Sequence, residues 1–156
     1  MANAAQLAAL RTGLCPLLTL SSAADAIAFY EKAFLAEELY RLIDPSDGRI
    51  GHAELLVYGN LVMVADEYPE AGVLSPQSIG GTSVRMNLVV DDAEAATALA
   101  VDAGAELLMP VTTHFYGDRA SNVRDPFGYT WMLSQVVEHV APEEMQQRWN
   151  DMVKGG

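Results

Sequence analysis

Two residues able to move protons stand close together near the middle of the chain. His52 and Glu54 are separated by one residue in the stretch 50–57, whose apolar pattern predicts a β-strand. Because side chains alternate between the two faces of a strand, both are expected to project from the same face. Such a pair can orient a ligand or carry a proton. The competing interpretation, which the residue pattern favours slightly, is a half-buried polar pair near a strand end.

A second stretch, rich in polar and aromatic side chains, runs from His114 to Arg119. It is expected in a loop or strand at the rim of a cleft, where Arg119 can pair with an anionic group while Tyr116 stacks on a ring. In the alternative, Arg119 pairs with Asp118 or Asp125 and the aromatic rings pack together. The sequence supports both equally, so His114, Tyr116 and Arg119 are candidate ligand-binding residues.

The chain repeats itself, and the repeat defines the elements that must position these residues. Segment 19–26 returns 70 residues later as 89–96, and segment 58–64 returns 69 residues later as 127–133. Two matches at nearly one offset indicate two copies of one supersecondary unit. A site between the copies would therefore draw equivalent positions from each half.

Hydrophobic periodicity predicts the same element order, strand, helix and three strands, in each half. We expect an α+β fold of tandem βαβββ modules forming a curled mixed sheet around a cleft. The predicted strands are 14–20, 38–43, 50–57, 61–65, 83–90, 105–109, 122–124 and 129–136. The predicted divisions are an N-terminal arm (1–13), a first module (14–65), a connector (66–81), a second module (82–137) and a helical tail (138–156).

Several other polar or reactive residues have mainly structural interpretations. The stretch 125–128, Asp-Pro-Phe-Gly, predicts a turn between two strands. Cys15 lies in an apolar stretch and is expected to be an inert thiol. Trp131 and Met132 must face opposite sides of one strand, so at most one of them lines a cleft. The chain has no nucleophile elbow, phosphate-binding loop, dinucleotide fingerprint or Cys-x-x-Cys pair.

Composition and charge exclude several classes of protein. The net charge of −12 argues against nucleic-acid binding, because phosphate contacts need clustered Lys and Arg. That charge serves either solubility or an acidic cleft that attracts a cationic ligand. No apolar run is long enough to span a membrane, and the N-terminus lacks the features of a secretory signal. We therefore expect a cytoplasmic protein with no membrane partner.

The duplicated βαβββ pattern resembles the vicinal oxygen chelate superfamily, also called the glyoxalase/bleomycin-resistance superfamily. Within it, the similarity is to the PhnB-like branch and extends over about residues 14–150. The segments that carry this similarity are 26–34, 51–55, 117–119, 123–131 and 142–145. Because one fold hosts many activities, the resemblance is informative about fold and says little about function.

The resemblance also implies where a metal ion would be bound. Metal-dependent members place His, Glu or Gln at four inward-facing positions on the first and fourth strands of each half. Counting from the strand motifs and turn glycines, these positions hold Cys15, Met63, Arg85 and Met132. Thioethers are soft ligands and a guanidinium carries the wrong charge for a divalent cation. We therefore predict no metal and no cofactor.

Arg85 is the most informative of these four residues. A positive charge where relatives hold a metal ligand can bind an anionic oxygen of a small molecule. Its alternative role is a salt bridge to one of the acidic residues. Arg85 is predicted to line a ligand cleft together with Met63 and Met132. Counting from the turn glycine assigns Met132, rather than Trp131, to this cleft.

These observations lead to a main hypothesis and two alternatives. The first is a metal-independent small-molecule-binding protein that sequesters a drug or metabolite and, as the resemblance implies, forms a homodimer. The second is a metal-dependent lyase or isomerase related to glyoxalase I, with a non-standard site built from His52, Glu54 and His114. The third is a structural or regulatory dimer without a ligand. The sequence leaves open whether the chain is an enzyme.

Overall fold

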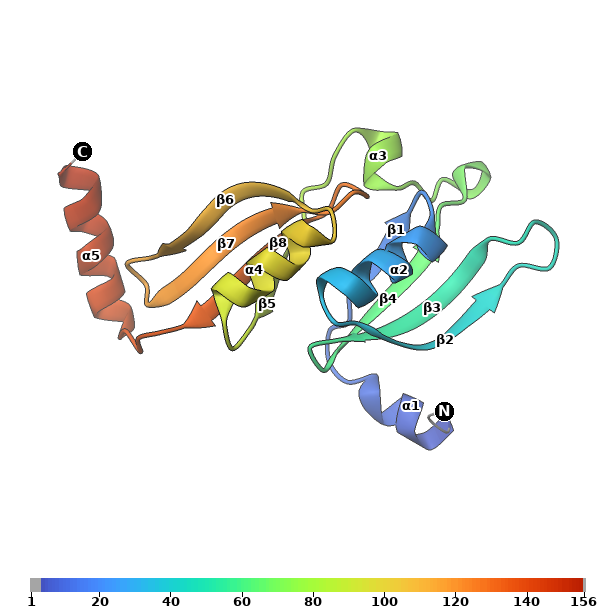
Figure 1. Cartoon of the computed structure of the whole chain (residues 1–156), viewed down its shortest axis with the longest axis horizontal. Helices are drawn as coiled ribbons and strands as arrows, with labels where there is room; N and C mark the ends of the chain where they lie inside the picture. Colours follow the sequence, from blue (N-terminus) through green and yellow to red (C-terminus); the bar gives the residue numbers. More distant parts are fainter. Residues whose placement is uncertain (1–3, 156) are drawn as a thin grey trace.

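The computed structural model describes residues 4–155, and the ends of the predicted arm and tail, residues 1–3 and 156, lie outside them. The chain forms two four-stranded mixed sheets, each covered on one face by a helix (Figure 1). A short helix, α1 (Ala4–Leu10), precedes the first module. The elements of this module are β1 (Leu17–Leu20), α2 (Ala23–Ala33), β2 (Glu37–Ile43), β3 (Ile50–Val57) and β4 (Asn60–Asp66).

The second module has the same order after a connector with a 3₁₀ turn and a short helix. The connector contains η1 (Pro69–Ala71) and α3 (Pro76–Ile79). The module consists of β5 (Arg85–Val89), α4 (Ala93–Asp102), β6 (Glu106–Thr113), β7 (Asp118–Arg124) and β8 (Thr130–Val136), and the tail helix α5 (Pro142–Lys154) follows it. The strand orders are β1-β4-β3-β2 and β5-β8-β7-β6, with the first strand of each module parallel to the fourth. The predicted α+β class and the tandem βαβββ order are confirmed.

Equivalent residues start the two covering helices. Ser22 caps α2 by accepting from the backbone N–H of Asp25, and Asp92 caps α4 by accepting from that of Ala95. A cap of this kind stabilises a helix by about 1 kcal/mol. The duplication therefore extends from the sequence to the hydrogen bonds that begin each helix.

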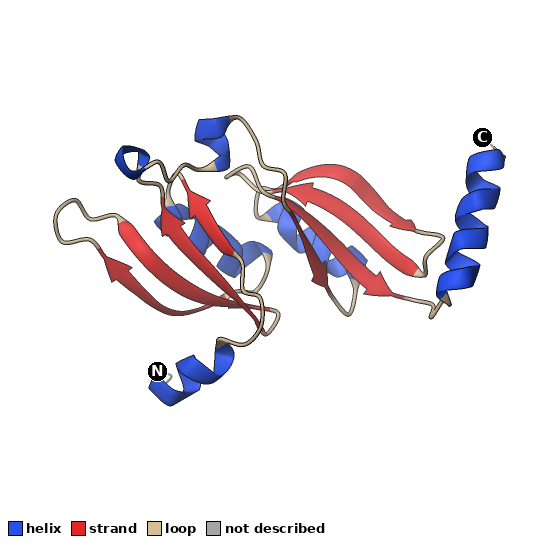
Figure 2. Cartoon of the chain, turned by 180° about the vertical axis from the view of Figure 1, so that it is seen from behind, coloured by secondary structure: helices blue, strands red, loops and turns tan. Residues whose placement is uncertain are grey.

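Both helices lie on the same side of the molecule and contact each other. Figure 2 shows the opposite side, where each sheet has a face that neither α2 nor α4 covers. We call these two surfaces the open faces. The sheets remain separate, and β1 and β5 form the edges nearest the junction between the modules.

Three strands differ from their predicted limits by three residues or more. β1 begins at Leu17 rather than at residue 14, because its paired register with β4 begins at Leu17. β7 covers Asp118–Arg124 although its sequence is mostly polar, because every residue in it pairs with β8. β6 extends to Thr113 as its antiparallel partner. Pairing in the sheet, rather than apolar alternation, sets these boundaries.

Asp125 joins the two modules in the core. Its carboxylate is 3% exposed and accepts hydrogen bonds from Tyr30 Oη at 2.8 Å and Trp131 Nε1 at 2.9 Å. The backbone N–H groups of Phe127 and Tyr129 donate to its other oxygen at 2.9 Å. Burial raises the pKa of Asp125 above its ordinary value despite these four bonds. The predicted turn at 125–128 is present, but its first residue also receives a donor from α2.

Replacing Asp125 with Ala should lower the free energy of unfolding by about 3 kcal/mol, because it leaves buried Tyr30 and Trp131 donors without an acceptor. Tyr30→Phe should lower the free energy of unfolding by about 1 kcal/mol, because it removes one hydrogen bond and leaves no buried donor without an acceptor. Urea denaturation at pH 7 measures both. The exposed Asp102→Ala is the control and should change stability by less than about 0.5 kcal/mol. Equal losses for Asp125→Ala and the control would contradict this role.

Candidate functional site

Three of the predicted site residues share the open face of the first module. His52 and Glu54 on β3 alternate with Ala53 and Leu55, which are buried in the core beneath α2. Glu54 lies directly across from Met63 on β4. The prediction that His52 and Glu54 share a strand face is therefore confirmed.

Glu54 is the centre of a hydrogen-bonded cluster, and its side chain is 0% exposed. Its Oε1 accepts from Arg11 Nε at 2.7 Å and Tyr40 Oη at 2.9 Å, and lies 3.3 Å from His52 Nε2. Arg11 Nη2 also forms an ion pair with this oxygen. The second oxygen, Oε2, is buried and accepts no hydrogen bond from the described residues. We call these four residues the Glu54 cluster.

The charge of the cluster depends on these donors. Burial raises the pKa of the Glu54 carboxyl, but the hydrogen bonds from Arg11, Tyr40 and His52 outweigh burial and leave that pKa below its ordinary value. Burial and the neighbouring Glu54 raise the pKa of Tyr40. At neutral pH the cluster therefore holds an ionised carboxylate beside a neutral phenol. Sequence reasoning missed Tyr40 and Arg11. Strand alternation in β2 offered a signal for Tyr40, and nothing in the sequence indicated Arg11.

The open face of the second module carries neutral polar groups at the equivalent positions. Met132 lies across from Asn87 on β5 and from Asn122 on β7. Ser134 Oγ donates to Asn87 Oδ1 at 2.9 Å. The duplication thus places an amide, Asn122, where the first module has the carboxylate of Glu54.

The strand pairs show which residues lie beside the four positions that the resemblance implied for a metal. Met63 pairs with Leu17 and Met132 pairs with Asn87, which are two residues beyond Cys15 and Arg85 along the chain. Cys15 precedes β1, and Arg85 is an exposed residue at the start of β5. Neither Cys15 nor Arg85 therefore lies directly opposite a methionine.

The residues that pair on the open faces, Leu17, Met63, Asn87 and Met132, do not fit a divalent metal ion. One amide oxygen, two thioethers and a leucine side chain lack the charged or imidazole donors that such ions need. Within residues 4–155, no group of three or more His, Cys, Asp and Glu side chains is arranged to hold a metal. His52 and Glu54 are together, but His114 belongs to the other module. The set proposed for a lyase or isomerase therefore does not converge.

In the stretch from His114 to Arg119 the aromatic rings pack together, as one of the two interpretations expected. His114 and Tyr116 stack at 5.0 Å between ring centroids, and Phe115 contacts Trp149 of α5. Arg119 pairs with Glu94 of α4, and so points to the helix-covered face of its sheet. That partner is neither of the two aspartates weighed from the sequence, because α4 crosses β7 at this point. These residues do not join Met132 on the open face.

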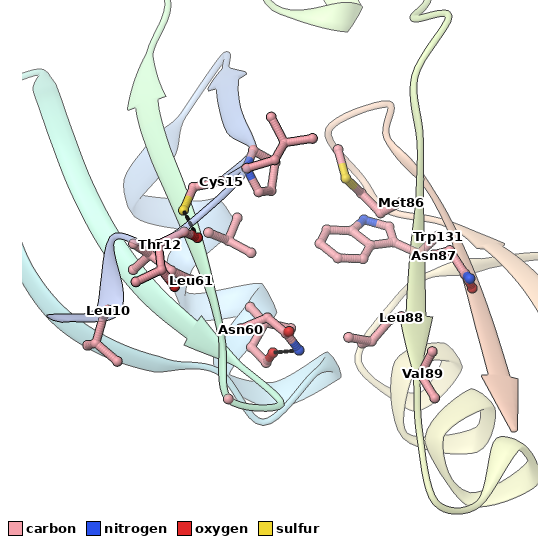
Figure 3. A pocket seen from close by; sticks show the side chains of 15 residues that line it. Leu10, Thr12, Cys15, Asn60, Leu61, Met86, Asn87, Leu88, Val89 and Trp131 are labelled. Carbon is pink, nitrogen blue, oxygen red and sulfur yellow. Dashed lines mark hydrogen bonds between the residues drawn. The ribbon is translucent and has the colours of Figure 1, made fainter. Parts of the chain in front are cut away.

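Two adjoining cavities lie between the modules. The first, of about 390 Å³, has walls from the arm, the β3–β4 hairpin and β5 (Figure 3). Trp131 lines it, whereas Met63 and Met132 are absent from the walls of both cavities. The second, of about 520 Å³, is lined by Arg85, Asn87 and Tyr129 among others. The structure thus brings Arg85 to a cavity, and it places Trp131 where Met132 was expected.

Comparison with known families now identifies the architecture. Residues 15–133 match the family model described as the Glyoxalase/Bleomycin resistance protein/Dioxygenase superfamily. The chain belongs to this superfamily. It is 41% identical over 136 residues to the protein Rv0887c of Mycobacterium tuberculosis, covering 85% of this chain and 79% of that protein.

Solved structures show the same fold. The Arabidopsis thaliana gene product At5g48480 has a TM-score of 0.63 at 32% identity, covering 79% of this chain and 98% of that one. TioX from Micromonospora sp. ML1 has a TM-score of 0.61 at 24% identity, covering 80% and 98%. A PhnB protein from Bacillus cereus has a TM-score of 0.60 at 16% identity, covering 80% and 99%. The last two likenesses concern the fold alone, and membership of the PhnB-like branch remains a proposal.

Replacing Glu54 with Gln should lower the free energy of unfolding by about 2 kcal/mol at pH 7, because three donors lose a charged acceptor. Since the folded-state pKa of Glu54 is depressed, the stabilisation is complete above the ordinary carboxyl pKa. It is lost as the pH falls through the folded-state value, so the difference from wild type should shrink toward pH 3. Urea denaturation across this range measures it, with the exposed Glu31→Gln as control. A difference independent of pH would contradict an ionised Glu54.

Proposed function

We propose that this protein binds a small molecule between its two modules without a resident metal ion, and that it sequesters a drug or metabolite. The observation that carries the proposal is the first cavity. Its volume of about 390 Å³ falls within the usual range for sites that enclose small ligands. The residues paired on the open faces support the metal-independent form, because they offer no suitable donor set.

The walls of this cavity combine apolar surface with a few polar groups. Trp131, Met86 and Leu88 provide apolar and aromatic contacts, and Thr12 and Asn87 provide hydrogen-bonding groups. Asn87 is held by Ser134, which occupies its amide oxygen and orients the amide nitrogen. Such a mixture favours a ligand with an aromatic or aliphatic body and a small number of acceptors.

Further parts of the proposal concern assembly and location. Apolar side chains on the open faces, including Leu17 and Val89, are each 58% exposed, which favours burial against a second copy in a homodimer. No helix within residues 4–155 is long and apolar enough to cross a membrane. We place the dimer in the cytoplasm. A solved relative of the same fold, from Listeria monocytogenes, is described as the fosfomycin resistance protein FosX, at 18% identity and a TM-score of 0.59 over 86% of this chain and 98% of that one.

The cavity is tested with the fluorescent probe 8-anilinonaphthalene-1-sulfonate. One probe molecule per chain is expected, and Met86→Trp, which fills the cavity wall, should weaken binding about tenfold or more, equivalent to about 1.4 kcal/mol. Met152→Trp makes the same change on the exposed part of α5 and should leave affinity unchanged. Equal binding by both variants would overturn the proposed site. Saturation with a cellular ligand should then raise Tm in wild type more than in Met86→Trp.

Elemental analysis of protein purified without chelator tests metal independence. We expect less than about 0.1 divalent ion per chain, since the donor set suits no common divalent cation. A content near one ion per chain, lost together with activity on replacing His52 or His114 with Ala, would instead overturn the metal-independent proposal and favour the lyase or isomerase alternative. Cys15→Ser should leave the metal content unchanged.

A further inference from the structure

The positive charge of the Glu54 cluster comes from outside the sheet. Arg11 follows α1 in the N-terminal arm, whereas Tyr40, His52 and Glu54 lie on β2 and β3. Figure 1 places α1 at the edge of the first module, apart from α2 and α4. A seven-residue helix is too short to be stable without support from packing. The arm can therefore leave this position more easily than the strands can.

Arg11 satisfies Glu54 only in part. Both its Nε and its Nη2 reach Oε1, the oxygen that Tyr40 and His52 also contact. Arginine commonly binds a carboxylate through two parallel bonds, one to each oxygen. Here the buried Oε2 has no donor among residues 4–155. The cluster therefore has room in its hydrogen bonding for a cation that meets both oxygens.

The energetics of the ion pair are asymmetric. Arg11 is 49% exposed, so losing this partner to water has a small cost for the arginine itself. Glu54 is fully buried, and a buried carboxylate without a cation is strongly disfavoured. The site consequently requires a positive group but does not require that it be Arg11.

The arm also links the cluster to the cavity. Leu10 and Thr12, the neighbours of Arg11 on either side, both line the first cavity (Figure 3). Movement of this segment would remove part of the cavity wall and uncover Glu54 at the same time. A ligand that displaces this segment can then present a cationic group to the carboxylate.

We propose that the Glu54 cluster is a subsite for a guanidinium or primary ammonium group of a small molecule, and that Arg11 occupies it as an internal competitor. This inference rests on the proposed function and names the charge of the ligand. Binding exchanges one cation for another on Glu54, with Tyr40 and His52 completing the contacts. The net charge of −12 adds a long-range attraction for such ligands.

The experiment uses agmatine, which carries both a guanidinium and a primary ammonium, with sodium chloride at equal ionic strength as the reference. Isothermal titration calorimetry compares wild type, Arg11→Ala and the double variant Arg11→Ala with Glu54→Gln. Removing the competitor should tighten agmatine binding about tenfold or more, and the second substitution should abolish the gain. Arg41→Ala removes a guanidinium from the Arg41–Glu38 pair on the same sheet and should behave as wild type.

A stability measurement keeps the proposal testable if Arg11→Ala folds poorly. Methylguanidinium at millimolar concentration should raise the Tm of Arg11→Ala toward the wild-type value, whereas sodium chloride should not. The double variant should show no such rescue. Binding or rescue independent of Glu54, or equal affinity in wild type and Arg11→Ala, would overturn the inference.

The naphthalene-sulfonate titration, repeated on these variants, separates this inference from the proposed function. Dye binding in the cavity without Glu54-dependent agmatine binding would contradict the cation subsite alone. Glu54-dependent agmatine binding without dye binding in the cavity would contradict the proposed cavity site and support the cation subsite.

Discussion

The buried carboxylate of Asp125 accepts hydrogen bonds from both halves of the molecule, and the packing of the two modules against each other depends on it. Tyr30 reaches it from the helix of the first module, and Trp131 reaches it from the last strand of the second. A second bridge runs from Tyr129, whose hydroxyl contacts both backbone groups of Thr19 at the edge of β1. Because the bonds of Tyr129 hold β1 near the start of β8, they also position the walls of the cavities between the modules.

The two modules share a framework and differ in chemistry at equivalent positions. Glu54 in the first module corresponds to Asn122 in the second, and Leu17 corresponds to Asn87. Met63 and Met132 are equivalent positions on the two open faces that carry the same residue type. Backbone pairing and helix caps constrain a duplicated fold in both copies, whereas side chains on an open face are free to diverge. The open face of the first copy carries a carboxylate and that of the second carries neutral amides, so the two faces differ in charge.

The N-terminal arm connects features that the fold alone would leave separate. It supplies Arg11 to the buried carboxylate and, through Leu10 and Thr12, part of the cavity wall. The tail helix α5 lies at the opposite end of the molecule and packs Trp149 against Phe115 (Figure 1). The two terminal segments thus have different roles, since only the arm contacts the groups proposed to bind a ligand.

The duplicated βαβββ order and the shared strand face of His52 and Glu54 followed from the sequence, because both depend on local periodicity. Asp125 was predicted as a turn residue or as a partner of Arg119, and not as an acceptor for Tyr30, which is distant in the chain. The strand register required the strand pairs themselves. The contact of Arg11 with Glu54, the pairing of Arg119 with α4 and the place of Trp131 in a cavity wall became visible in the folded chain. Each of these depends on elements brought together by folding, and no local pattern encodes such contacts.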